Sequence, residues 1–414
     1  MIITRRFAGQ LLAGVAVTAT LGRFDLALAA EKAVTVALDL SLTGADAEGA
    51  KRVEYGALLA FDEANAAGGA GGYKINVVPM DDGSATAGQY DPAQAATNAR
   101  KMASDKSVVA ALGPQMSGAG KAMSPILSMA DLATITPSST NPDITDPKFA
   151  AQYRPAGKAV YFRTVTTDAY QGPNMANYFA DVLKTKSIFV LDDSGAYGVG
   201  LADAFQGQAE KKGIKVLGRD RLDPKAADYS AILTKVKSLN PDGLYYGGVL
   251  QAGVKLLKQA YDILPATMVK GGGDGLYGPE ILTAVGFPAA EGWYCSNASP
   301  HSMVDPKSQD FIKRYTAKFN VQPDDYAITA YVGAQVIVDA IKRVAATGKP
   351  VTRSAVRDAI QGTKLDSLIG SVEFDANGDL VSKVVSIFQV KKDVAFPLED
   401  MSAQLKYIGI APAT

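Results

Sequence analysis

The sequence predicts an α/β protein with two doubly wound, mainly parallel sheets and a crevice between them. Short runs of β-branched and other apolar residues alternate with amphipathic stretches of helix length, which is typical of parallel sheets covered by helices. The alternation pauses and begins again, and 414 residues exceed the length at which one core stops growing. In such sheets a ligand sits beyond the carboxyl ends of the strands, so we expect the site in the crevice.

The first sheet is predicted between residues 34 and 136. Apolar runs predict strands at 34–40, 75–80, 108–112 and 133–136. Amphipathic stretches between them predict helices at 53–66, 92–103 and 119–129. Gly68 and Gly69 end the first helix, and Pro137 ends the last strand.

The pattern restarts at residue 161. Further strands are expected at 161–164, 187–191, 214–217, 244–247 and 268–270. The helices between them are expected at 170–183, 201–212, 232–239 and 254–260.

The last part of the chain departs from this alternation. Helices are predicted at 307–319, 326–346 and 352–361. A hairpin should follow, with strands at 371–374 and 383–390 joined through 375–379, because Asn377-Gly378 is a strong turn signal.

The composition argues against several classes of function. Lys and Arg together number 42, as do Asp and Glu, so nothing favours nucleic acid or an anionic membrane surface as a partner. A single cysteine, Cys295, excludes an intramolecular disulfide. A single histidine, His301, disfavours zinc sites and Ser-His-Asp triads. We therefore expect no cofactor, no metal and no enzymatic activity.

Residues 1–29 have the features of a cleaved export signal. Arg5 and Arg6 precede a modestly apolar run at 7–21 that is too short to span a bilayer, and Ala27-Leu28-Ala29 resembles a cleavage site. Thr4-Arg5-Arg6 also resembles a twin-arginine signal, although Phe7 stands one place early for that motif. An ordinary secretory signal and an amphipathic helix of a cytoplasmic protein are the alternatives. We expect a periplasmic protein.

A series of short motifs makes the chain resemble the periplasmic branched-chain amino acid-binding proteins of ABC importers. Each motif is weak alone, but their order and spacing match along nearly the whole chain after residue 29. They are Leu42-Thr43-Gly44, Gly56 with 60–65, Asp81-Asp82, Asp91-Pro92, 135–140, Tyr197-Gly198, Asp242 with 245–248, Glu291-Gly292, and Phe374-Asp375 with 377–379.

The resemblance implies a type I periplasmic binding protein: two lobes joined by three crossover segments, placed near Thr166, Ser299 and Gly370. One lobe would comprise 30–166 and 300–370, and the other 167–299 and 371–414. It also implies a monomer that closes by a hinge motion around a small amino acid-like ligand and delivers it to a membrane permease.

The resemblance further assigns eight ligand-binding positions. Ser117 would bind the ligand carboxylate, and the segment of Ser138, Ser139 and Thr140 its polar end. Asp274 would bind the ammonium group. The remaining candidates are Tyr197, which would cover the ligand, and the second-rank residues Asp168 and Tyr326. Ordinary structural roles remain open at these positions: a helix cap at Ser117, a Pro-Ser-Ser turn at Ser138, and exposed loops at Tyr197 and Asp274.

Some positions differ from the family pattern. The loop 45–48 lacks an aromatic residue that often floors the side-chain pocket, and Val249 stands where the family has another aromatic. Ser84 and Met116 replace a cysteine pair found in some members, and 84–90 resembles an insertion. These changes bear on the ligand's side chain. An aliphatic one is the first expectation, with aromatic acids, amides and polar amino acids as alternatives.

Three other functions are weighed. The segment 273–278 matches G-x-G-x-x-G, but it lies mid-chain without an acidic residue at the usual distance for a dinucleotide site. Ser117 lacks the G-x-S-x-G motif of a hydrolase because Gln115 replaces its first glycine. A ligand sensor on the same fold is the third alternative, and the export signal argues against its cytoplasmic form.

Overall fold

The computed structural model describes residues 32–413, so the predicted export signal lies outside the described residues. The chain from Lys32 onward forms one compact unit that contains two large sheets. Within residues 32–413, no helix combines the length and apolar character needed to cross a membrane.

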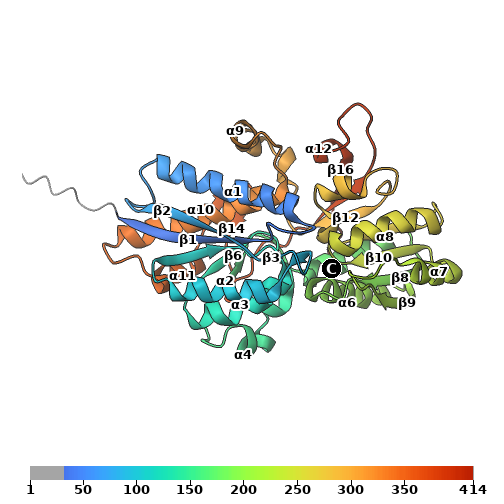
Figure 1. Ribbon diagram of the computed structural model, residues 1–414, viewed down its shortest axis with the longest axis horizontal. Helices are drawn as coiled ribbons and strands as arrows, with labels where there is room; N and C mark the ends of the chain where they lie inside the picture. The colour runs from blue at the N-terminus through green and yellow to red at the C-terminus, as the bar shows by residue number, and fades with distance from the viewer. Residues whose placement is uncertain (1–31, 414) are drawn as a thin grey trace, which may run out of the picture. The chain divides into compact units, whose positions relative to one another are not determined.

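The first sheet is entirely parallel and has the strand order β2-β1-β5-β6-β7. Every residue of β5 is buried, as its Val-Val-Ala-Ala-Leu sequence requires in a sheet covered on both faces. Helices α1 and α10 lie on one face, and α2 and α3 lie on the other (Figure 1). The bounds are β1 (Ala33–Leu40), β2 (Lys74–Asp81), β5 (Val108–Leu112), β6 (Thr134–Thr136), β7 (Tyr161–Arg163), α1 (Ala47–Ala66), α2 (Pro92–Ser104), α3 (Ser117–Met129) and α10 (Asp325–Ala346).

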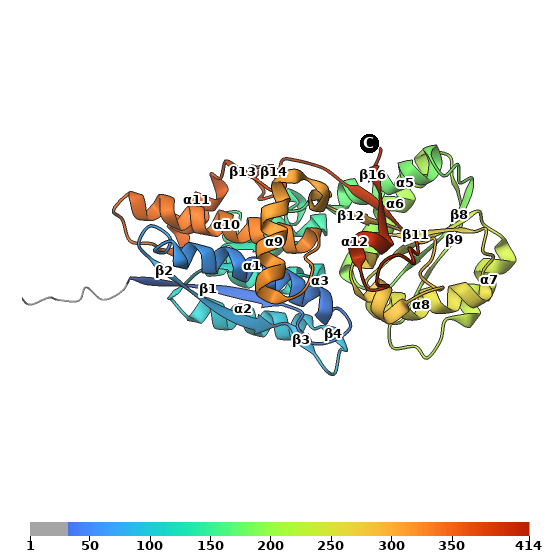
Figure 2. The same cartoon turned by 90° about the horizontal axis from the view of Figure 1, so that it is seen from above.

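The second sheet has the order β16-β15-β12-β11-β10-β8-β9. Strands β8 to β12 pair in parallel, whereas β15 and β16 add antiparallel edges. Helices α5 and α6 cover one face, and α7 and α8 lie on the other (Figure 2). The bounds are β8 (Ser187–Asp192), β9 (Lys215–Arg221), β10 (Gly243–Gly247), β11 (Val269–Gly272), β12 (Tyr294–Asn297), β15 (Ser386–Val390), β16 (Leu405–Ile410), α5 (Asp168–Asp181), α6 (Ala196–Lys211), α7 (Ser230–Leu239) and α8 (Leu250–Ile263).

Smaller elements complete the described chain. Two short pairs, β3 with β4 and β13 with β14, stand apart from the large sheets. The remaining bounds are β3 (Gly83–Ser84), β4 (Gln89–Tyr90), β13 (Leu365–Ser367), β14 (Gly370–Val372), α4 (Ala150–Tyr153), α9 (Gln309–Phe319), α11 (Arg353–Gln361) and α12 (Met401–Gln404).

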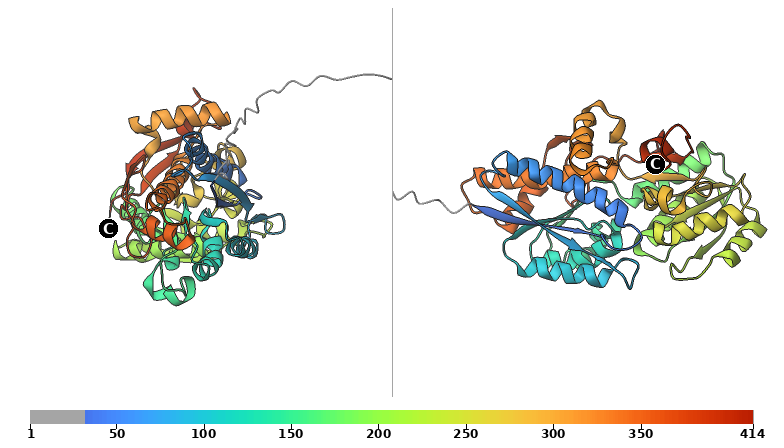
Figure 3. Two further views of the ribbon diagram at one scale, coloured as in Figure 1. Left: turned by 90° about the vertical axis from the view of Figure 1, so that its left-hand side faces the viewer. Right: turned by 45° about the horizontal axis from the view of Figure 1, so that its top comes forward.

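Helices α1 and α10 are far apart in the sequence but lie side by side (Figures 1 and 3). Gly56 makes this close approach possible, because a Cβ at that position would lie 2.1 Å from the carbonyl oxygen of Ala327. The contact places the middle of α1 against the first turn of α10, which carries Tyr326.

The structure confirms the predicted α/β class with mainly parallel sheets and corrects two details. Strand β7 extends the first sheet beside β6, so the second sheet begins at β8 and not at residue 161. The predicted hairpin of 371–374 with 383–390 is wrong, because β14 pairs with β13, whereas β15 lies between β12 and β16. The Asn377-Gly378 turn does form, with Gly378 at φ +97° and a bridge between Phe374 and Leu380.

Candidate functional site

A cavity lies where the carboxyl ends of strands from both sheets meet. It comprises about 580 Å³ of space between protein atoms, part of it open to solvent. Five of the eight predicted positions line it, namely Ser117, Ser138, Tyr197, Asp274 and Tyr326.

The carboxylate of Asp274 is the most heavily hydrogen-bonded group of the cavity wall. It follows β11, and its Oδ1 accepts hydrogen bonds from the Tyr197 hydroxyl at 2.6 Å and from Nε2 of Gln171 at 2.8 Å. The Tyr326 hydroxyl donates to Oδ2. Burial raises the pKa of Asp274, and these three hydrogen bonds to the ionised form offset part of that rise.

Gln171 fixes Asp274 from behind the cavity. Its Oε1 accepts from the Asp274 backbone N–H at 2.9 Å and from the Ser296 hydroxyl at 2.7 Å. Its Nε2 also donates to Oδ1 of Asp168 at 2.8 Å. Asp168 is fully buried and lies outside the cavity lining; burial and the neighbouring Asp274 raise its pKa to about 8. The predicted residue Asp168 therefore lies behind the cavity wall.

The opposite wall presents the hydroxyl of Ser117, the first residue of α3. Its Oγ accepts hydrogen bonds from the Asn141 backbone N–H at 3.2 Å and from the Ser139 hydroxyl at 3.3 Å. With two hydrogen bonds already accepted, its own proton remains to be donated. Met116 occupies the N-cap position of α3, so Ser117 is not a helix cap.

The segment after β6 supports this wall. Ser138 lines the cavity and donates from its hydroxyl to the Gln115 carbonyl at 3.0 Å. Ser139 and Thr140 lie behind it, where the Thr140 carbonyl accepts from the Asp168 N–H at 2.9 Å. The Ser138–Thr140 segment is therefore built into the wall and is not a free surface turn.

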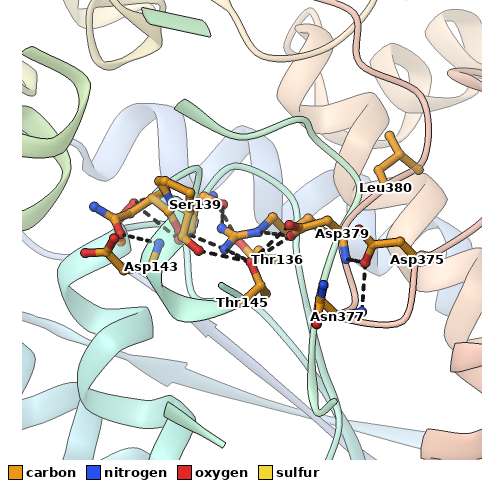
Figure 4. Close-up of polar contacts among 12 residues, drawn as sticks. Thr136, Ser139, Asp143, Thr145, Asp375, Asn377, Asp379 and Leu380 are labelled. Carbon is orange, nitrogen blue, oxygen red and sulfur yellow. Dashed lines mark hydrogen bonds and ion pairs between the residues drawn. The ribbon is translucent and has the colours of Figure 1, made fainter. Parts of the chain in front are cut away.

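A buried arginine on β7 holds this segment in place. Arg163, with 0% of its side chain exposed, pairs with Asp379 at 2.8 Å. It also donates to the carbonyls of Ser139 at 2.6 Å and Asn141 at 2.8 Å. Figure 4 shows Ser139, Thr145 and Asp379 gathered around this network. Arg163 thus fixes the backbone that carries three predicted site residues.

The other part of the cavity is acidic. Asp46, at the N-terminus of α1, and Glu280, after the Asp274 turn, both line it and are both 6% exposed. Oε1 of Glu280 accepts from the Gly49 N–H at 2.8 Å. Burial and the neighbouring Glu280 raise the pKa of Asp46 to about 8, and burial raises the pKa of Glu280 to about 7.

Several residues of the site escaped the sequence analysis. The lining residues Glu280 and Tyr277 and the supporting residue Gln171 were not singled out, and Asp46 and Gln115 were noted only as departures from motifs. Asp46 and Glu280 share one sequence signal. Asp46 comes two residues after the motif 42–44, and Glu280 comes two residues after the motif 273–278, and each of these motifs follows a strand. Apolar side chains complete the lining, namely Val53, Met116, Val249 and Leu250.

Three hydrogen bonds connect segments next to the first sheet with segments next to the second. Asn141 Nδ2 donates to the Ala196 carbonyl at 2.9 Å, and Gln251 Nε2 donates to the Ala87 carbonyl at 2.8 Å. The Gly49–Glu280 bond is a third. These contacts hold the two walls together around the cavity.

Comparisons with known proteins agree with this architecture. Residues 33–395 match the model of a family described as periplasmic binding protein. A Leu/Ile/Val-binding protein homologue of Brucella melitensis is 32% identical over 92% of this chain and 96% of its own. A leucine-, isoleucine-, valine-, threonine- and alanine-binding protein of Pseudomonas aeruginosa is 29% identical over 94% of this chain and 96% of its own.

Solved structures show the same fold. A leucine-binding protein of Thermotoga maritima superposes with a TM-score of 0.78 at 25% identity, over 91% of this chain and 98% of its own. A substrate-binding protein of a branched-chain amino acid transporter from Streptococcus pneumoniae, solved with isoleucine, gives 0.76 at 24% identity, over 91% of this chain and 100% of its own.

Proposed function

The chain belongs to the periplasmic binding protein family, and from this membership we propose that it is the solute-binding component of an ABC importer. Its ligand is a branched-chain or related amino acid, captured between two lobes. The observation that carries the proposal is the opposition of a donating serine and a buried carboxylate across one cavity.

The two ends of an amino acid fit these two groups. The Ser117 hydroxyl, whose oxygen already accepts two hydrogen bonds, donates to the ligand carboxylate at the start of α3. The Asp274 carboxylate takes the ammonium group in a charge-assisted hydrogen bond. Tyr197 and Tyr326 keep their protons, because burial raises the pKa of both well above its usual value, and they orient the Asp274 oxygens.

Closure of the lobes accompanies capture. We assign residues 30–166 and 300–370 to one lobe and 167–299 and 371–414 to the other, with hinges near Thr166, Ser299 and Gly370. A ligand that touches both walls only in the closed state binds that state more tightly than the open state. It therefore favours closure by the difference between the two binding free energies. The bonds from Asn141 and Gln251 belong to the closed form.

A membrane permease then recognises the closed protein in the periplasm. The protein acts there as a monomer and releases its ligand chemically unchanged. Among residues 32–413, the cavity lining holds no serine or cysteine beside a base: the Ser117 hydroxyl is bonded there to Ser139 and the Asn141 N–H.

Calorimetry with each of the common amino acids tests this function. At least one should bind, and mass spectrometry should recover it unaltered. Asp274→Asn should weaken binding by about 2–5 kcal/mol, because it removes one partner of a buried charge pair. Asp220→Asn, at a partly exposed position on β9 outside the cavity lining, serves as the control with unchanged affinity. Chemical turnover of the ligand, or equal affinity of Asp274→Asn, refutes the assignment.

A further inference from the structure

Asp46 has an unusual position for a helix-capping residue. It precedes α1 at the N-cap position, where an aspartate commonly accepts a hydrogen bond from the first turn, yet its side chain makes no such bond. The residue is 6% exposed and lines the cavity. Among residues 32–413, no group donates to its buried Oδ2. A buried carboxylate oxygen without a donor costs free energy unless a ligand supplies one.

A second buried acceptor lines the same cavity. Oε1 of Gln115, in the segment between β5 and α3, also has no hydrogen-bond donor within the described chain. Glu280 adds a carboxylate whose Oε1 receives one backbone hydrogen bond, from Gly49. Three side chains from three segments thus present acceptor oxygens to the cavity.

No positive side chain balances these acids in the lining that the structure describes. The lining holds the carboxylates of Asp46, Asp274, Glu280 and Asp324 but no lysine, arginine or histidine. Asp324 caps α10 by accepting from the Ala327 N–H at 2.8 Å. Asp274 is matched by the ligand's ammonium in the function proposed above. Asp46 and Glu280 therefore face no cationic side chain in the lining that the structure describes.

We propose that the ligand is an α-amino acid with a cationic side chain, whose ammonium or guanidinium group is received by Asp46, Gln115 and Glu280. This inference rests on the proposed function: it keeps an amino acid as the ligand but assigns it a cationic side chain in place of a branched aliphatic one. The α-carboxylate and α-ammonium still bind Ser117 and Asp274. The aliphatic part of the side chain lies against Val53, Met116, Val249 and Leu250.

An aliphatic side chain fits these observations poorly. It would leave the already buried acceptor oxygens of Asp46 and Gln115 without a hydrogen bond, which is unfavourable. A guanidinium group carries five N–H donors and an ammonium group three, so either can serve several acceptors at once.

Isothermal titration of the full chain at pH 8, freed of copurified ligand, tests the inference with matched pairs of ligands. Citrulline has nearly the shape of arginine without its charge, and norleucine has the length of a lysine side chain without its ammonium group. We expect arginine or lysine to bind at least about 30-fold more tightly than its neutral partner. Equal binding of citrulline and arginine overturns the cationic assignment in favour of a neutral donor.

Substitutions in the cavity lining test which residues bind the cationic group. Asp46→Asn should weaken the cationic ligand by about 30-fold and leave norleucine nearly unchanged. Glu280→Gln provides a second variant if Asp46→Asn fails to fold. Asp62→Asn, on the same helix but paired with Lys318 at the surface, is the matched control with unchanged binding.

The outcomes separate the two proposals. Tight binding of leucine or isoleucine together with weak binding of arginine and lysine overturns this inference and leaves the proposed function standing. Absence of binding by every amino acid overturns both.

Discussion

At the scale of single residues, the site is organised by buried polar groups whose partners come from distant parts of the sequence. Gln171 bonds Asp274, which is 103 positions away, and Arg163 bonds Asp379, which is 216 positions away. Ser117, Tyr197 and Asp274 could be predicted because they follow strand ends within recognisable motifs. Asp46 and Glu280 are harder to predict: each follows a motif after a strand, but an acidic residue in a loop is usually exposed, and only tertiary contacts bury these two.

Asp379→Ala should lower the free energy of unfolding by about 3 kcal/mol, because it leaves the guanidinium of Arg163 buried without its counter-charge. Chemical denaturation measures the loss. Asp366→Ala is the control: that carboxylate is 84% exposed, lies 3.9 Å from Lys307, and its removal should cost less than about 1 kcal/mol. Equal losses of stability from the two substitutions would show that the buried ion pair contributes no more to the free energy of unfolding than the exposed one.

At the scale of elements, the sequence predicts the parallel core well and the sheet edges poorly. Buried parallel strands such as β5 are continuous apolar runs, and these are visible without a structure. Strand β12 reads Tyr-Cys-Ser-Asn and was missed, since its burial comes from its neighbours β11 and β15 and not from an apolar pattern. The wrong hairpin at 371–390 has the same origin: a turn signal specifies a turn but not the strands that flank it.

The turn that leaves β5 makes a further prediction. Gly113 has φ +112°, and a Cβ there would lie 2.0 Å from the Asp39 carbonyl oxygen at the end of β1. Gly113→Ala should therefore cost at least about 3 kcal/mol of stability, from strain and from separation of the strand ends that position Ser117.

Gly157→Ala is the matched control for this substitution. Gly157 also has positive φ, at +85°, but nothing lies within 4 Å of its added Cβ. Only the conformational cost of about 1–2 kcal/mol should appear in its thermal or chemical unfolding. A loss at Gly113 no larger than that at Gly157 contradicts the steric argument.

At the scale of the whole molecule, buried acids make stability depend on pH. Burial raises the pKa values of Asp46 and Asp168 to about 8 and those of Asp82 and Glu280 to about 7. Glu280, Asp193 and Asp82 surround Asp46, whereas Asp168 faces Asp274 and Arg163. Unfolded carboxyls titrate near pH 4, so the folded chain holds protons that the unfolded chain releases at neutral pH.

The stability from these protonated acids is complete below about pH 4 and declines as the pH rises through 7 to 8. The melting temperature of the unliganded protein should therefore be higher at pH 6 than at pH 8.5. Each proton held only by the folded state contributes about 1.4 kcal/mol per pH unit. Scanning calorimetry at constant ionic strength measures the slope, and Asp46→Asn should flatten it. A melting temperature that rises with pH would falsify this account.

The placement of β16 has a consequence for how the chain acquires its shape during synthesis. The second sheet starts with strands from residues 187–221 but is completed by residues 386–410, and α10 reaches the first sheet only after residue 325. During synthesis from the amino end, β12 therefore remains an unpaired sheet edge, and one face of the first sheet remains partly uncovered. Both are completed only when the last fifth of the chain has been made. Such edges invite pairing with other chains, so the nascent protein needs protection until translation is nearly complete.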